Sequence, residues 1–188
     1  MVLNLKPHEY VERLSENKHI MMLYDNEMYA KEVELVFVRK GLENGEHCIY
    51  IMHDGWRPVR DEWDSMGIDV DEEVKRGMLH IVGPGNHGEL SGGWPDLGVL
   101  PSLGHGKVRV VGRWIPDIET VHGISSELGI ERKVGEQFRG INGSVMCTYP
   151  ASKICSKGRS NWTLQIINEH DVVIFVTGPG EGRVHEIG

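Results

Sequence analysis

The chain has 188 residues, and its hydrophobic content of 39% is sufficient for one domain with a buried core that needs no disulfides. The formal net charge of −8 argues against nucleic acid or an anionic membrane as a partner, because both attract a basic surface. Cys48, Cys147 and Cys155 form an odd set without a CxxC pair, which indicates free thiols in a reducing compartment and predicts a cytoplasmic location. Apolar and charged residues alternate at the amino end, so we expect no signal peptide, and no run reaches the roughly 18 apolar residues that span a bilayer.

In chain order, hydrophobic periodicity predicts a helix over 7–16, strand 19–24, helix 27–42, strand 48–52, helices 58–66 and 70–76, strands 78–82 and 107–113, a helix over 116–138 interrupted near Gly129, strand 144–149, helix 160–169 and strand 171–177. Asp25 or Asn26 supplies the cap of the second helix. The first two strands are almost wholly apolar and are joined by one helix, which favours a right-handed β-α-β crossover. The alternation predicts a single α/β domain over 1–188, with a mostly parallel sheet covered by helices on both faces.

Two segments follow no helical or strand period. Residues 83–106 form a long loop rich in glycine and proline, and residues 178–188 are expected to be a flexible, glycine-rich tail. The loop carries four apolar side chains that water would solvate poorly: Trp94, Leu97, Val99 and Leu100. They either cover the sheet as a lid or form a subunit contact, and a homodimer is one form that such a contact could take.

Three blocks of sequence resemble the MEDS domain, the methanogen and methylotroph sensory domain typified by the regulator DcmR. The blocks consist of His19, Tyr24, Asp25, Phe37, Gly41-Leu42, Gly45-Glu46 and Cys48-Ile49-Tyr50, then Met146-Cys147-Thr148-Tyr149, then His170 to Val176. The resemblance implies a three-layer, RecA-like fold, related to the KaiC and RecA ATPases but degenerate and used as a sensory or ligand-binding module. Pro150 departs from the family pattern, where an acidic residue usually follows the tyrosine, and the 83–106 loop replaces a shorter, more helical connection.

The turn after the first strand lacks the features of a phosphate-binding loop. RecA-like ATPases need glycines and a Lys-Ser or Lys-Thr pair there, so that backbone N–H groups and the lysine hold the phosphates. This chain has Tyr24-Asp25-Asn26-Glu27, and Lys31 follows a full turn too late. We therefore expect no ordinary P-loop ATPase activity.

Ligands of open parallel sheets bind outside the carboxyl ends of the strands. The residues that the predicted strands deliver there are Tyr24, Asp25, His53, Asp54, Arg113, Trp114 and Tyr149. Such a site is aromatic and mixed in charge, and it suits a planar or hydrophobic small molecule with polar groups. Each member also has an ordinary alternative, since the two tyrosines can be packing residues and Asp54 can make a turn with Gly55.

Catalytic and metal motifs are weak. Neighbouring residues such as His53 and Asp54 point to opposite faces of a strand, and no nucleophile elbow is present. Histidines around the long loop (His80, His87, His105) and the pair Cys48 and His53 lack ligand spacing such as CxxC or HExxH, so we expect neither a metal nor a cofactor. The two GPG sequences read as turns, because proline removes an N–H donor.

Taken together, these features favour a non-catalytic sensory domain that binds a small molecule at the strand carboxyl ends and signals to a protein partner. The alternatives are a divergent nucleotide-binding protein or enzyme without a Walker A motif, and a structural adaptor. Convergence of Asp25, His53, Asp54 and Arg113 on one pocket would favour the enzyme.

Overall fold

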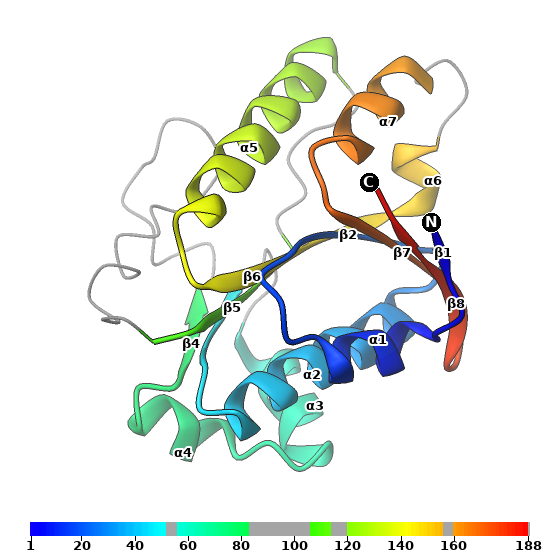
Figure 1. Cartoon of the computed structure of the whole chain (residues 1–188). Coiled ribbons are helices and arrows are strands. Elements are labelled where there is room, and N and C mark those ends of the chain that lie inside the picture. The colour runs from blue at the N-terminus through cyan, green and yellow to red at the C-terminus, as the bar shows by residue number, and fades with distance from the viewer. Residues whose placement is uncertain (52–55, 83–105, 114–119, 156–159, 188) are drawn as a thin grey trace.

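A computed structural model describes residues 1–51, 56–82, 106–113, 120–155 and 160–187 (Figure 1). The helices of this part of the chain are α1 (Pro7–Arg13), α2 (Glu27–Glu43), α3 (Trp56–Ser65), α4 (Val70–Lys75), α5 (Val121–Arg139), α6 (Ala151–Ile154) and α7 (Ser160–Ile167). The strands are β1 (Val2–Leu3), β2 (His19–Tyr24), β3 (His47–Ile51), β4 (Leu79–Val82), β5 (Val108–Gly112), β6 (Gly143–Pro150), β7 (Val172–Gly178) and β8 (Glu181–Glu186). Among the described helices, none is long and apolar enough to cross a membrane.

All eight strands form one sheet in the order β1-β8-β7-β2-β6-β5-β3-β4. From β7 to β4 each neighbouring pair is parallel, and only β8 and β1 at one edge are antiparallel. Every side chain of the central strand β2 is buried, as its apolar run predicts. The mostly parallel α/β sheet expected from the sequence is therefore confirmed.

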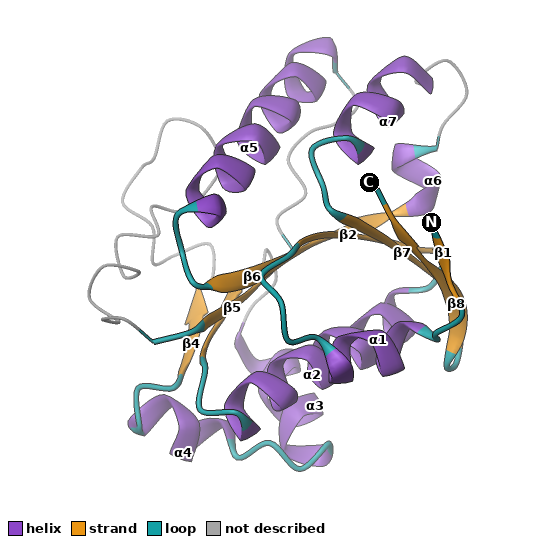
Figure 2. Ribbon diagram, viewed as in Figure 1, coloured by secondary structure: helices purple, strands orange, loops and turns teal. Residues whose placement is uncertain are grey.

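Helices cover both faces of the sheet and make three layers (Figure 2). Helices α1 to α4 lie on one face, here called the α2 face, where Ile20, Met22 and Tyr24 of β2 join the core. Helices α5 to α7 lie on the other, the α5 face, where Met21 and Leu23 pack. The alternation of side chains along β2 thus divides the core into two halves.

The chain switches faces at neighbouring strands. The connection after β2 runs through α2 on one face, whereas the connection after β6, which is paired with β2, runs through α6 and α7 on the other. In open α/β sheets such a reversal separates the two connections and opens a crevice at the carboxyl ends. Here that point lies where Tyr24 is paired with Pro150.

Two sequence expectations are wrong. The expected tail instead contains β8, which pairs with β1 and β7 and buries Val184, because a strand whose backbone is paired on both sides needs few buried side chains. Helix α5 also continues through Gly129, since nothing near this glycine opposes helical backbone. The loop over 83–105 lies outside the described residues.

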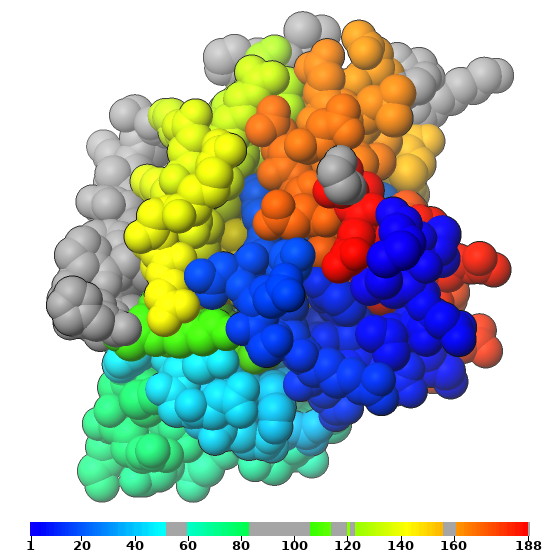
Figure 3. All heavy atoms as spheres, in the orientation of Figure 1, coloured from blue at the N-terminus to red at the C-terminus, as the bar shows by residue number. Residues whose placement is uncertain are grey.

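The two ends of the chain lie side by side at the sheet edge (Figure 3). Strand β1 pairs with β8, and the Met1 amino group donates a hydrogen bond of 2.6 Å to the carbonyl oxygen of Glu186.

Candidate functional site

Polar and aromatic side chains gather at the carboxyl ends of the strands on the α2 face. Arg113 follows β5 directly, and its Nη2 donates to Glu27 Oε1 at 2.8 Å, while its Nε lies 3.5 Å from Glu34 Oε1. The Tyr50 hydroxyl at the end of β3 donates to Glu34 Oε2 at 2.5 Å. Tyr24 at the end of β2 is within the electrostatic reach of Arg113 and completes the group. These five residues are called the edge cluster.

The edge cluster contains a carboxylate with no access to solvent. Burial raises the pKa of Glu34, against the opposing effects of Arg113 and Tyr50. Its Oε1 accepts no hydrogen bond from the described residues and lies 3.5 Å from Nε of Arg113. Burial opposes the charge on Arg113, but Glu34, Tyr50 and Glu27 outweigh it and raise the pKa of that guanidinium. Glu34 therefore holds the positively charged guanidinium of Arg113 in place at the carboxyl ends of the strands, where the Arg113 side chain is 10% exposed.

The turn between β2 and α2 consists of Asp25 and Asn26. Asn26 Oδ1 accepts a hydrogen bond of 2.9 Å from the backbone N–H of Met28 and caps α2. Asp25 is exposed, and its backbone N–H donates to the Val176 carbonyl oxygen at 3.2 Å. Because Asn26 caps the helix and the Asp25 N–H is bonded to β7, this turn does not form the glycine-rich loop of free N–H groups with which a P-loop holds phosphate.

Tyr149 lies on the opposite face of the sheet. Its hydroxyl donates to Glu127 Oε1 at 2.5 Å and also contacts Glu131 Oε1, both on α5. All three side chains are buried, and burial, followed by the two carboxylates, raises the pKa of Tyr149 well above its usual range. The structure thus brings Tyr24 and Arg113 together, with Asp25 next to Tyr24, but it separates Tyr149 from them. His53, Asp54 and Trp114 lie outside the described residues.

Glu27, Glu34 and Tyr50 were not among the predicted ligand-binding residues. The charges of the long helix, Lys31 and Glu34 included, indicate a solvated face by sequence alone, and for Glu34 this interpretation is wrong because its side chain is buried. A signal for Glu34 was present, because it falls within the apolar stripe of α2, between Ala30 and Phe37. An acidic residue at a position that helical spacing assigns to the core requires a specific partner.

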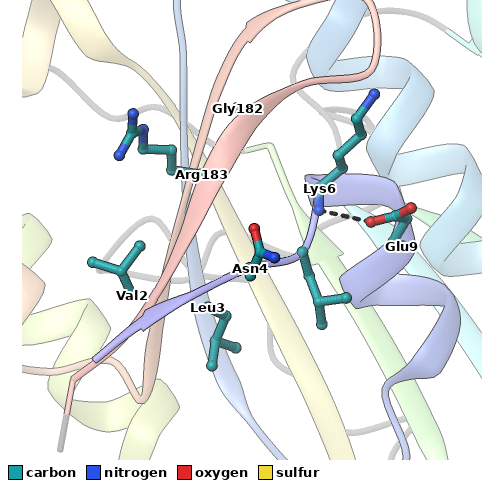
Figure 4. A pocket seen from close by; sticks show the side chains of 8 residues that line it. Val2, Leu3, Asn4, Lys6, Glu9, Gly182 and Arg183 are labelled. Carbon is teal, nitrogen blue, oxygen red and sulfur yellow. Dashed lines mark hydrogen bonds between the residues drawn. The ribbon is translucent and has the colours of Figure 1, made fainter.

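The described residues also line two hollows, neither of which contains a predicted site residue. One of about 500 Å³ lies at the sheet edge between β1, the start of α1 and β8, where the Lys6 backbone N–H donates to Glu9 Oε2 at 3.0 Å (Figure 4). The other, of about 280 Å³, is mainly apolar and lies between α1, α2 and the β7–β8 turn. Its lining includes Tyr29, Val36 and Val176. The carbonyl oxygen of Val176 accepts the hydrogen bond from the backbone N–H of Asp25.

A prediction on pH concerns Glu127. Burial and then Glu131 raise the pKa of Glu127 from its ordinary value of 4.5 to about 8. Between these values the folded state keeps a proton that the unfolded state has lost, so this group makes stability fall as pH rises. Glu127→Gln removes this titrating group. The folding constant of the variant, divided by that of the wild type, is therefore expected to rise with pH, by at most about tenfold per pH unit. Urea unfolding between about pH 5 and pH 8, with EDTA present to chelate metal ions, measures this change. Parallel curves of unfolding free energy against pH for the wild type and the variant would contradict it.

The comparisons with known proteins agree with this architecture. Among solved structures, a KaiC-like protein from the hyperthermophilic archaeon Pyrococcus horikoshii OT3 superposes with a TM-score of 0.61 at 17% identity, over 92% of this chain and 79% of that one. The fold is therefore a three-layer, RecA/KaiC-like α/β fold. The profile of the MEthanogen/methylotroph, DcmR Sensory domain matches residues 18–159, and the chain belongs to this MEDS family. No curated protein matches the chain significantly.

Proposed function

We propose that this chain is a non-catalytic sensory domain that binds a small molecule at the carboxyl ends of its parallel strands and passes its occupancy to a protein partner. The observation that carries the proposal is the edge cluster: a guanidinium held by a buried carboxylate, which interacts with Tyr24 at the point where the connections change face. Membership of a sensory family supports the same role. Three free cysteines support a cytoplasmic location, although the first two are buried.

Arg113 and Tyr24 are the side chains proposed to meet the ligand. Arg113 would donate hydrogen bonds to an acceptor atom of the ligand, and the Tyr24 ring would pack against an apolar or planar part. Glu34 acts through Arg113, because it is fully buried and holds the guanidinium in position. Asp25, His53, Asp54, Trp114 and Tyr149 remain predictions as ligand contacts; for Tyr149 the contact would have to come from the α5 face.

The test begins with a thermal-shift screen of small metabolites and nucleotides, with and without Mg²⁺, because a ligand of the folded state raises the Tm by mass action. Calorimetry then compares the hits on the wild type, on Arg113→Gln and on Arg39→Gln. Arg39 is a matched control, since it lies on α2 and pairs there with the exposed carboxylates of Glu12 and Glu43. We expect Arg113→Gln to weaken binding by about tenfold or more and Arg39→Gln to leave it unchanged.

The outcomes distinguish the alternatives. A saturable shift with a nucleotide and Mg²⁺ would favour the divergent nucleotide-binding protein. Equal affinities of the wild type and of Arg113→Gln, with the variant folded by circular dichroism, would remove the edge cluster from the site. The absence of any ligand throughout the screen would favour the structural adaptor.

A further inference from the structure

Four side chains that can bind metal converge on the α5 face, away from the edge cluster. His19 begins β2, Cys147 lies within β6, Glu131 is on α5, and His170 precedes β7. All four are buried, and one potential ligand atom from each lies within 4.8 Å of the others. Two neighbouring strands, the turn before β7 and the covering helix contribute to the group, which is called the histidine cluster.

Both histidines are oriented in the same way. His19 Nδ1 lies 2.9 Å from the carbonyl oxygen of Glu169, and His170 Nδ1 lies 2.7 Å from that of Ile166. A carbonyl oxygen can only accept, so each Nδ1 carries a hydrogen, and in the neutral ring Nε2 is left with its lone pair. The two Nε2 atoms lie 3.1 and 3.2 Å from the same oxygen, Glu131 Oε2.

The Cys147 thiol, 3.6 Å from His19 Nε2, is a weak hydrogen-bond donor at this meeting point. His170 Nε2 and Glu131 Oε2 have no hydrogen-bond partner among the described residues. Protonation of both rings would place two positive charges with ring centroids 4.0 Å apart in the core. A bound cation would satisfy every one of these atoms.

We propose that His19, Glu131, Cys147 and His170 form a buried transition-metal site whose donor set suits Zn²⁺. Bond lengths of about 2.0 Å to nitrogen or oxygen and about 2.3 Å to sulfur place tetrahedral ligand atoms about 3.3 to 3.5 Å apart. The corresponding contacts here are 3.1 and 3.2 Å to Glu131, and 3.6 Å between Cys147 Sγ and His19 Nε2. One carboxylate and one thiolate also balance the charge of a divalent ion, with loss of the thiol proton on binding.

The surroundings match those of a metal site with four protein ligands. Backbone carbonyls fix both imidazoles through Nδ1, and the Tyr149 hydroxyl occupies the other oxygen of Glu131. Because all four ligands come from the protein and are buried, the site is closed and structural rather than open to a substrate. The ion would bind α5 to β2, β6 and the start of β7. This inference is independent of the proposed sensory function.

The experiment uses the full chain, without an affinity tag, grown in minimal medium supplemented with Co²⁺ or Zn²⁺. Elemental analysis is expected to give one metal ion per chain. The cobalt form should show a thiolate-to-cobalt charge-transfer band in the near ultraviolet and strong visible bands typical of tetrahedral coordination. Cys147→Ser is expected to abolish the charge-transfer band, and His170→Gln to lower the metal content, whereas Cys155→Ser, which changes an exposed thiol, retains both.

The wild-type result decides the proposal even if a variant fails to fold. A wild-type protein that takes up no Co²⁺ or Zn²⁺ overturns it and leaves Glu131 neutralised by a protonated histidine. A charge-transfer band that survives in Cys147→Ser and disappears in Cys155→Ser overturns it in favour of a surface site. Chelation of the wild type is expected to lower its Tm, and an unchanged Tm after verified metal removal would exclude a structural ion.

Discussion

Arg109→Ala is expected to destabilise the folded state by about 3–5 kcal/mol, because it removes the 2.7 Å partner of the buried Glu46 carboxylate and leaves that carboxylate with Lys107 at 3.9 Å. The Arg109 side chain is 1% exposed and bonds Glu46 at 2.7 Å through Nε. Its guanidinium also donates to the carbonyl oxygens of Val11, Leu14 and Phe37, so one side chain joins α1, α2, the α2–β3 turn and β5. Urea unfolding measures the loss.

Two variants control this experiment. Arg76→Ala removes an exposed arginine that is paired with Glu73, and we expect a loss below about 1 kcal/mol. The double variant Arg109→Met/Glu46→Met removes both charges and should recover part of the stability, although the hydrogen bonds from the guanidinium to the three carbonyl oxygens are lost. A loss below about 1 kcal/mol for Arg109→Ala would show that the ion pair contributes little.

Gly182→Ala is the second large effect that we expect, with a loss of at least about 2–3 kcal/mol. Gly182 has φ +154°, and an added Cβ would lie 1.9 Å from the Phe175 carbonyl oxygen and 2.7 Å from Pro7 Cγ. The carbonyl belongs to β7, so relief requires the β7–β8 pair to separate. The unfolding midpoint in urea should fall accordingly.

Gly129→Ala is the matched control for the same chemical change. Nothing lies within 4 Å of a Cβ at Gly129, which is inside α5. Alanine is the better helix former, so stability should increase by about 0.5–1 kcal/mol. Equal effects of the two substitutions would contradict the steric argument.

The central sheet could be predicted from the sequence, and its edge could not. The run from His19 to Tyr24 is almost wholly apolar because β2 is covered on both faces, and its predicted bounds match the structure. Strands β1 and β8 bury little side-chain surface and are held mainly by backbone hydrogen bonds. Periodicity does not detect a strand that has few buried side chains and is held mainly by main-chain atoms.

The carboxyl-end rule identified residues of the site but not the face on which each lies. Tyr24 is paired with Pro150, so Tyr149 must point to the opposite side of the sheet. The side chain of any strand residue changes face when the register shifts by one, and a single sequence does not specify register between distant strands. For this reason, the sequence alone assigns Tyr24 and Tyr149 to one ligand site at the carboxyl ends of the strands.

Buried acids on helices were a detectable signal that the sequence analysis missed. Glu34 in α2, and Glu127 and Glu131 in α5, all occupy positions of the buried stripe. The histidine cluster was harder to find, since His19 and His170 are brought together only by the pairing of β2 with the end of the chain. Searches for short ligand spacing cannot detect donors that the sheet itself assembles.

The pairing of β1 with β8 determines how the molecule responds to a pulling force. The two antiparallel strands place both chain ends at the same end of the pair, where Met1 is bonded to Glu186. Tension applied between the ends therefore loads the hydrogen bonds of this pair one after another, as in opening a zipper, and not all at once in shear. A tether that carries force through these ends would peel β1 away while the six parallel strands behind it stay intact.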